Sequence, residues 1–258
     1  MVAKIGFMRV ALSNPLDIRK EVKLIVDIPC IEHEEWRADI TSALKTFEGF
    51  ASAGGLPPVI DWDYQCEVIG TVEYEQGGLI CSWPSFPFGT VGVVMMLRML
   101  GNLRRGKAQL TNVALTGTAT TAEGAVVLKS LEEMANRLPA GVTLLPFQLT
   151  LCPSASWINI ECEFQSPFPD ELPTALHAAI MTWCNVANAG GFQIESETEG
   201  TANVDSFGVG MDEPVVGENF VQWHCPMAGV PPSSLTCLVN VLAYFSNRNH
   251  PIFAVYIG

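Results

Sequence analysis

The residues best suited to covalent chemistry are an imidazole and a thiol that stand next to each other, His224 and Cys225. They lie where an expected strand leads toward a helix, and the amides of a helix N-terminus can stabilise a reactive cysteine thiolate. Cys81 lies near the corresponding place in the first half of the chain. Cys225, His224 and Cys81 are therefore candidate catalytic residues for acid–base or nucleophilic chemistry in a cleft between two halves.

Strand geometry favours a plainer interpretation of the same residues. Neighbouring residues of a strand point to opposite faces, so His224 cannot readily activate Cys225. The eight cysteines include no C-x-x-C pair and none at zinc spacing beside a histidine pair. Because the N-terminus does not read as a signal peptide, we expect a cytoplasmic protein with reduced, mostly buried thiols.

Two groups of carboxylates are candidate sites for a cation or for acid–base chemistry. Asp61 and Asp63 lie on one face of an extended segment and could hold a cation, but the neighbouring prolines suit an ordered loop. His33 stands among three glutamates, which the helix dipole favours in a first turn without any metal. Phosphate-binding and nucleophile-elbow motifs are absent. The sequence therefore predicts no cofactor and no metal, and favours a binding protein over an enzyme.

The charge is strongly asymmetric along the chain. The net charge is −13, and residues 138–258 hold 11 acidic residues and a single basic one, Arg248. Such a surface repels nucleic acid and anionic membranes. No apolar run approaches the roughly 18 residues that a membrane span needs. We therefore expect neither a nucleic acid nor a membrane as partner.

The densest acidic segment runs from Glu195 to Glu218 and has seven carboxylates, no Lys or Arg, and several glycines. It contains an insertion relative to the first half, and inserted loops often carry function. One interpretation is a surface that docks a basic protein, and the other is a solvated loop. The candidate partner-binding residues are Glu195, Glu197, Glu199, Asp205, Asp212 and Glu213.

Two helices that must frame these segments match each other at an offset of 136 residues. Their apolar residues recur every three or four positions, and both end in Ala-Gly-Gly. The first series is Trp36, Ile40, Ala43, Leu44, Phe47, Phe50 and Ala51, and the second is Leu172, Leu176, Ala179, Ile180, Trp183, Val186 and Ala187. This match predicts an internal duplication.

The flanking segments extend the match to whole halves. Each half reads strand, helix, strand, strand, helix, strand, which is the ferredoxin-like βαββαβ order, and each has an extra N-terminal strand. The expected fold class is α+β, with two related halves packed as one pseudo-symmetric unit. The predicted parts are a first half over 1–121, a connecting amphipathic helix over 122–140 and a strongly acidic second half over 141–258.

Three functions remain open at this point. The leading hypothesis is a non-enzymatic intracellular protein whose acidic second half docks a basic protein, as an inhibitor or immunity protein does. The second is a cofactor-independent enzyme or small-ligand binder that uses Cys81, His224 or Cys225. The third is a structural or assembly role. The oligomeric state stays undetermined.

Overall fold

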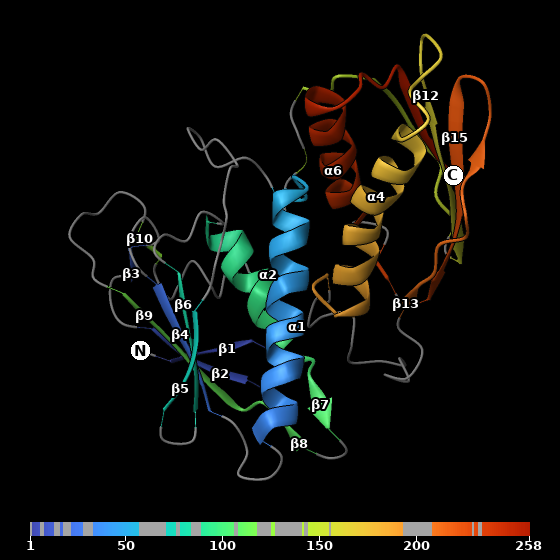
Figure 1. The fold of residues 1–258 in the computed structure, drawn as a ribbon. Coiled ribbons are helices and arrows are strands. Elements are labelled where there is room, and N and C mark those ends of the chain that lie inside the picture. The colour runs from blue at the N-terminus through green and yellow to red at the C-terminus, as the bar shows by residue number, and fades with distance from the viewer. Residues whose placement is uncertain are drawn as a thin grey trace. The chain divides into compact units, whose positions relative to one another are not determined.

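The structure, a computed structural model, is an α+β fold (Figure 1). The residues that it describes are 2–5, 8–12, 16–17, 22–27, 33–56, 71–75, 78–83, 89–105, 108–117, 125–126, 141, 144–154, 156–192, 208–228, 230–231 and 234–258. The contacts divide the chain into two compact units. Unit 1 comprises Met1–Glu48, Val59–Leu138 and Ala189–Glu199, and unit 2 comprises Gly49–Pro58, Pro139–Asn188 and Gly200–Gly258.

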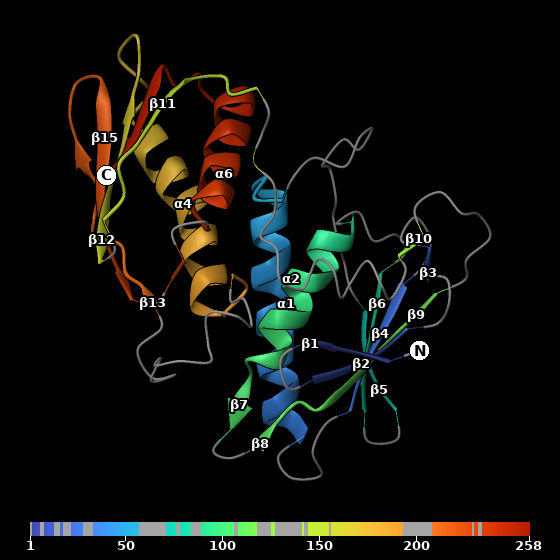
Figure 2. The same ribbon diagram turned by 180° about the vertical axis from the view of Figure 1, so that it is seen from behind.

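The large sheet of unit 1 has the strand order β1-β2-β9-β4-β6-β5 (Figure 2). Strands β2 and β9 are parallel, and every other neighbouring pair is antiparallel. The strands are β1 (Val2–Ile5), β2 (Met8–Leu12), β4 (Val22–Asp27), β5 (Thr71–Glu75), β6 (Gly78–Trp83) and β9 (Asn112–Gly117). Two short ladders pair β3 (Leu16–Asp17) with β10 (Ala125–Val126) and β7 (Arg104–Arg105) with β8 (Ala108–Gln109).

Helix α1 (His33–Ser52) confirms the helix predicted from the first apolar series, since all seven residues of that series are buried. Its last turn closes as the Gly pair predicts. Gly54 has a φ of 80°, and its N–H donates to the carbonyl of Ala51 at 3.0 Å. The second helix of the first half, α2 (Gly89–Gly101), is buried from Gly92 to Leu100, as its continuous apolar run requires.

Two expectations for the first half were wrong in detail. Ala125 and Val126 form strand β10 against β3, where a connecting helix was expected; the neighbouring residues 122–124 and 127–140 lie outside the described residues. One extra N-terminal strand was expected, whereas the structure has a hairpin of two strands there, β1 and β2. Both errors have one cause: a helical or extended pattern in the sequence does not reveal which distant backbone will pair with it.

The sheet of unit 2 has the order β11-β16-β12-β15-β13, with β14 also paired to β15. Strands β11 and β16 are parallel, and the other pairs are antiparallel. The strands are β11 (Gln148–Leu151), β12 (Trp157–Glu163), β13 (Gly208–Val209), β14 (Val215–Val216), β15 (Phe220–Ala228) and β16 (Ala254–Ile257).

Helices α4 (Leu172–Asn188) and α6 (Leu235–Arg248) lie on one face of this sheet (Figure 1). Strand β12 alternates with a period of two: Ile158, Ile160 and Cys162 are buried, Asn159 and Glu161 are half-buried, and the terminal Trp157 and Glu163 are exposed. Apolar side chains from alternate positions of β12, β15 and β16 thus form the core under the two helices.

Two buried indoles tie this core together. The Nε1–H of Trp183 donates to the carbonyl of Ser234 at 3.1 Å, and that of Trp223 donates to Nδ1 of His177 at 3.1 Å. His177 is a half-buried residue of α4. Its Nδ1 must be unprotonated to accept this bond. No helix among the described residues is long and apolar enough to cross a membrane.

Candidate functional site

His224 and Cys225 lie on opposite faces of β15. Cys225 is fully buried under the helices, whereas His224 is exposed on the other face. Nδ1 of His224 lies 3.0 Å from Oδ1 of Asn159, so the Nδ1–H tautomer can donate to that oxygen. The ring centroid of His224 is 5.6 Å from that of Trp157. The imidazole is thus occupied by surface contacts and does not face the thiol.

The surroundings of Cys225 oppose a thiolate. Burial raises the pKa of its thiol far above the ordinary value, and the nearby Cys184 thiol and Asp212 carboxylate raise it further. Because a protonated thiol is a poor nucleophile, the environment suits packing and not covalent catalysis. Cys81 lies in β6, opposite Leu24 of β4 in the ladder, and its side chain lies outside the described residues.

Several of the remaining cysteine and acid–base candidates lie outside the part of the chain that the structure describes. Asp61 and Asp63 lie outside the described residues, and so does the side chain of His33. Of the five described cysteines, four are buried and Cys152 is exposed. Among the described residues, no three His, Cys, Asp or Glu side chains are grouped to hold a metal ion.

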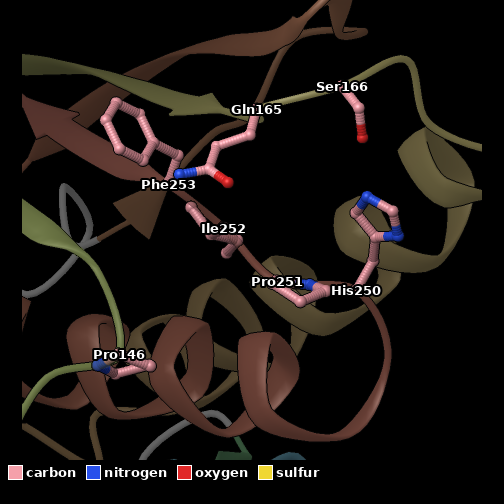
Figure 3. Close-up of a pocket in the computed structure, with 7 residues that line it drawn as sticks. All are labelled: Pro146, Gln165, Ser166, His250, Pro251, Ile252 and Phe253. Carbon is pink, nitrogen blue, oxygen red and sulfur yellow. The ribbon is translucent and has the colours of Figure 1, made fainter.

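A pocket that the sequence did not indicate opens beside the start of β16 (Figure 3). It has a volume of about 410 Å³, and its polar groups come from Gln165, Ser166 and His250. The Ser166 hydroxyl and the His250 ring point toward one another in Figure 3. The centroid of the His250 ring also lies 5.6 Å from that of the Phe164 ring. Such a pocket offers hydrogen bonds to a small polar molecule, and its described lining contains no Asp, Glu, Lys or Arg.

The most extensive feature of unit 2 is the sheet face opposite the helices, which we call the outer sheet face. It consists of Thr150, Trp157, Asn159, Glu161, Glu163, Gln222, His224 and Tyr256. Trp157 and Tyr256 are 42% and 43% exposed. Large aromatic residues such as these are enriched in protein interfaces.

Carboxylates surround these aromatic residues. Glu161 and Glu163 lie on β12, and the exposed Asp212 and Glu213 lie in the loop before β14. The N–H of Asp212 donates to the carbonyl of His224 at 3.0 Å, which holds this loop against β15. Because no Lys or Arg occurs from residue 138 to 247, the local sequence supplies nothing to neutralise these charges.

Two of the six acidic candidates, Asp212 and Glu213, are exposed residues of this loop, and the main-chain bond to His224 brings Asp212 alongside β15. The other four, Glu195, Glu197, Glu199 and Asp205, lie outside the described residues. Sequence reasoning missed Glu161 and Glu163 as neighbours of this cluster. The alternation of β12 was a usable signal, because it already assigned both residues to the exposed side of the strand.

No family model and no curated protein matches the chain. Among solved structures, the chain has a slight likeness to a predicted insulinase family protease from Yersinia pestis. The identity is 11% over 97% of this chain and 73% of that one, and the TM-score is 0.21. The periplasmic protease PqqL from Escherichia coli gives 9% identity over 96% of this chain and 37% of that one, also with a TM-score of 0.21. A peptidase M16 inactive domain from Pseudomonas fluorescens gives 10% identity over 97% and 80%, with a TM-score of 0.20. Likenesses this slight assign neither a family nor an activity to the chain.

Proposed function

We propose that the chain is an internal duplication of two ferredoxin-like halves. The strand order β2-β9-β4-β6-β5 in the first half has a counterpart in the order β11-β16-β12-β15-β13 in the second. In both halves the first two strands of this series are parallel and the following ones antiparallel. The matched helix series and the two left-handed glycines, Gly54 and Gly190, add to this support. An experimental structure with different strand orders in the two halves would contradict the proposal.

We further propose that the protein is a non-enzymatic binding protein whose acidic second half docks a basic protein partner, in the manner of an inhibitor or immunity protein. The observation that carries this proposal is the outer sheet face, where exposed Trp157 and Tyr256 lie among carboxylates. Aromatic side chains supply contact area, and the surrounding charge selects a basic partner and accelerates its capture.

The charge imbalance of the second half supports the same proposal. Residues 138–258 hold eleven carboxylates and one arginine, and the carboxylates repel one another. Folding gains nothing from that repulsion. A basic partner would cancel the field on binding. A reducing compartment is part of the proposal, because the described cysteines are free thiols.

The test compares charge-neutral variants that differ in where the charge is removed. The probe is a decapeptide of alternating Lys and Val, and its association rate is measured by stopped-flow fluorescence anisotropy at low salt. Asp212→Asn with Glu213→Gln should slow association roughly threefold, because each removed charge weakens electrostatic steering. The Glu195→Gln, Glu197→Gln and Glu199→Gln triple variant is expected to act in the same direction.

The matched control removes two exposed carboxylates from the first half, Asp27 and Glu34, and should leave the association rate unchanged. Unfolding free energies of the acidic-loop variants should stay within about 0.5 kcal/mol of the parent, since exposed charges contribute little to folding. Raising the salt to about 0.5 M should remove the difference between the variants. Equal rates and equal salt dependence for every variant would show that the acidic segment is only a solvated loop.

A further inference from the structure

The sheet of unit 2 ends, among the strands that the structure describes, on β11. Strand β11 pairs with β16 along one of its two sides. The N–H groups of Gln148 and Cys152 donate toward β16, to the carbonyls of Phe253 at 3.1 Å and Ile257 at 2.7 Å. Since successive amides of a strand alternate in direction, the N–H and C=O groups of Leu149 and Leu151 point away from β16 to the edge.

An apolar groove runs along the helix side of this edge. It is about 270 Å³ in volume, and its walls come from the β11 region and from α6. The apolar lining residues are Leu145, Leu149, Leu151, Pro153, Leu235 and Val239. Leu151 is 48% exposed and Leu144, just before the strand, is 85% exposed. The edge therefore offers main-chain hydrogen bonds and, beside them, space for apolar side chains.

The first half shows what occupies the corresponding place there. Strand β2, which holds the position of β11 in the strand order, carries β1 along its outer edge in an antiparallel ladder from Val2↔Ala11 to Ile5↔Met8. On β11 no described strand takes that place. An added strand would extend the second sheet in the way that β1 extends the first.

Charge decides which added strand fits. Neighbouring strands lie about 4.8 Å apart, so the backbone of a strand added beyond β11 would lie about 14 Å from Glu161 and Glu163 of β12, farther than the Debye length of about 8 Å at physiological salt. A long Lys or Arg side chain that lies over the outer sheet face would carry its charge back toward these carboxylates. A second copy of the chain would bring another net charge of −13 to this surface and be repelled. A basic strand would be attracted.

We propose that the basic partner binds by adding an extended segment antiparallel to the β11 edge, an inference that rests on the proposed function. Apolar side chains of that segment enter the groove between β11 and α6, and Lys or Arg side chains at the alternate positions lie over the outer sheet face. The residues of the added segment that lie opposite Leu149 and Leu151 point to the same face of the sheet as these leucines. Each such residue exchanges two N–H···O=C hydrogen bonds with the leucine opposite it.

Backbone methylation of the probe tests this arrangement without altering the protein. In the Lys/Val decapeptide, the valines are the residues expected to face the groove and donate to β11. N-methylation of the valines should weaken binding at least tenfold, whereas N-methylation of the lysines, whose amides point to solvent, should change it less than threefold. Equal weakening by the two modifications, or weakening by neither, would overturn the proposed register.

A variant of the protein tests the same edge. Leu151→Pro removes an N–H that points away from β16 and should weaken binding about tenfold, while Leu151→Val keeps the N–H and should bind within threefold of the parent. Both variants are checked for unfolding temperature and circular dichroism. Should Leu151→Pro fail to fold, the methylated peptides still decide the question.

The outcomes separate this inference from the proposed function. Binding that depends on Asp212 and Glu213 but not on Leu151 or valine methylation would retain a basic partner and overturn the β11 edge as its site. Binding that ignores salt and the acidic variants would sink the proposed function itself. A concentration-dependent dimer of the parent that Leu151→Pro abolishes in analytical ultracentrifugation would assign the edge to a second copy and overturn the partner strand.

Discussion

Gly54→Ala is expected to lower the free energy of unfolding by about 3 kcal/mol, because it combines two penalties. Gly54 has a φ of 80°, a conformation that an L side chain adopts only with strain. A Cβ built on it would also overlap Cβ and Cγ of Tyr244. Those atoms lie next to the backbone of α6, so the tyrosine cannot move aside by rotating the far end of its side chain.

The matched control is Gly49→Ala in α1, the helix whose C-terminal end Gly54 closes. Gly49 is an exposed residue of α1, and a Cβ there would meet nothing within 4 Å. Alanine is the better helix former, so this variant should gain about 0.5–1 kcal/mol. Urea unfolding followed by circular dichroism measures both, and a Gly54→Ala loss below 1 kcal/mol would contradict the assigned geometry.

Gly190→Ala should lose less than Gly54→Ala, about 2 kcal/mol, although its φ of 78° is nearly the same. Its Cβ would overlap the amide end of Asn102, whose Nδ2 donates to the Gly190 carbonyl at 3.2 Å. A side-chain end can rotate away at the loss of one hydrogen bond, which the Cβ of Tyr244 cannot do.

Stability is expected to fall steeply in alkali because three buried thiols cannot ionise in the folded protein. Burial raises the pKa of Cys184 from 9.0 to about 12, and it raises the pKa values of Cys162 and Cys225 further. The unfolded chain releases these protons from about pH 9 upward, whereas the folded protein retains them. The stability contributed by these thiols is therefore complete below pH 9 and decreases as the pH rises toward 12, by about 1.4 kcal/mol per pH unit for each thiol.

Single variants isolate this contribution from lysine and tyrosine titration. Cys225→Ala should be less stable than the parent at pH 7, because the smaller side chain leaves a cavity. Between pH 9 and 11 its free energy of unfolding should fall less steeply than that of the parent, and the two slopes should differ by about 1.4 kcal/mol per pH unit. Cys152→Ala, which removes an exposed thiol, controls for the loss of a cysteine outside the core. The measurement is urea unfolding at a series of pH values, and identical slopes for Cys225→Ala and the parent would refute the burial argument.

Several features of this protein follow from short stretches of sequence alone. The apolar series from Trp36 to Ala51 predicts α1, the Ala-Gly-Gly end predicts its left-handed closure at Gly54, and the alternation from Trp157 to Glu163 predicts which side of β12 is buried. Each depends on contacts within a few residues or on a simple period, so the pattern is visible without knowing the partners. The acidic bias of residues 138–258 likewise needs only a count.

Other features were decided only by tertiary structure, because they depend on which distant segments meet. Ala125 and Val126 form a strand since Leu16 and Asp17 supply a backbone to pair with, more than 100 residues away. The pKa of the Cys225 thiol is raised mainly because the helices bury it against the sheet, and further because Cys184 of α4 lies nearby. Among the described strands, β11 forms the edge of its sheet because β16 pairs with it on one side, and α6 lines the groove beside it. No local pattern in residues 148–151 predicts the pairing or the groove. Short-range periodicity decides which face of an element is apolar, whereas the long-range pairing of elements decides which face stays open to a partner.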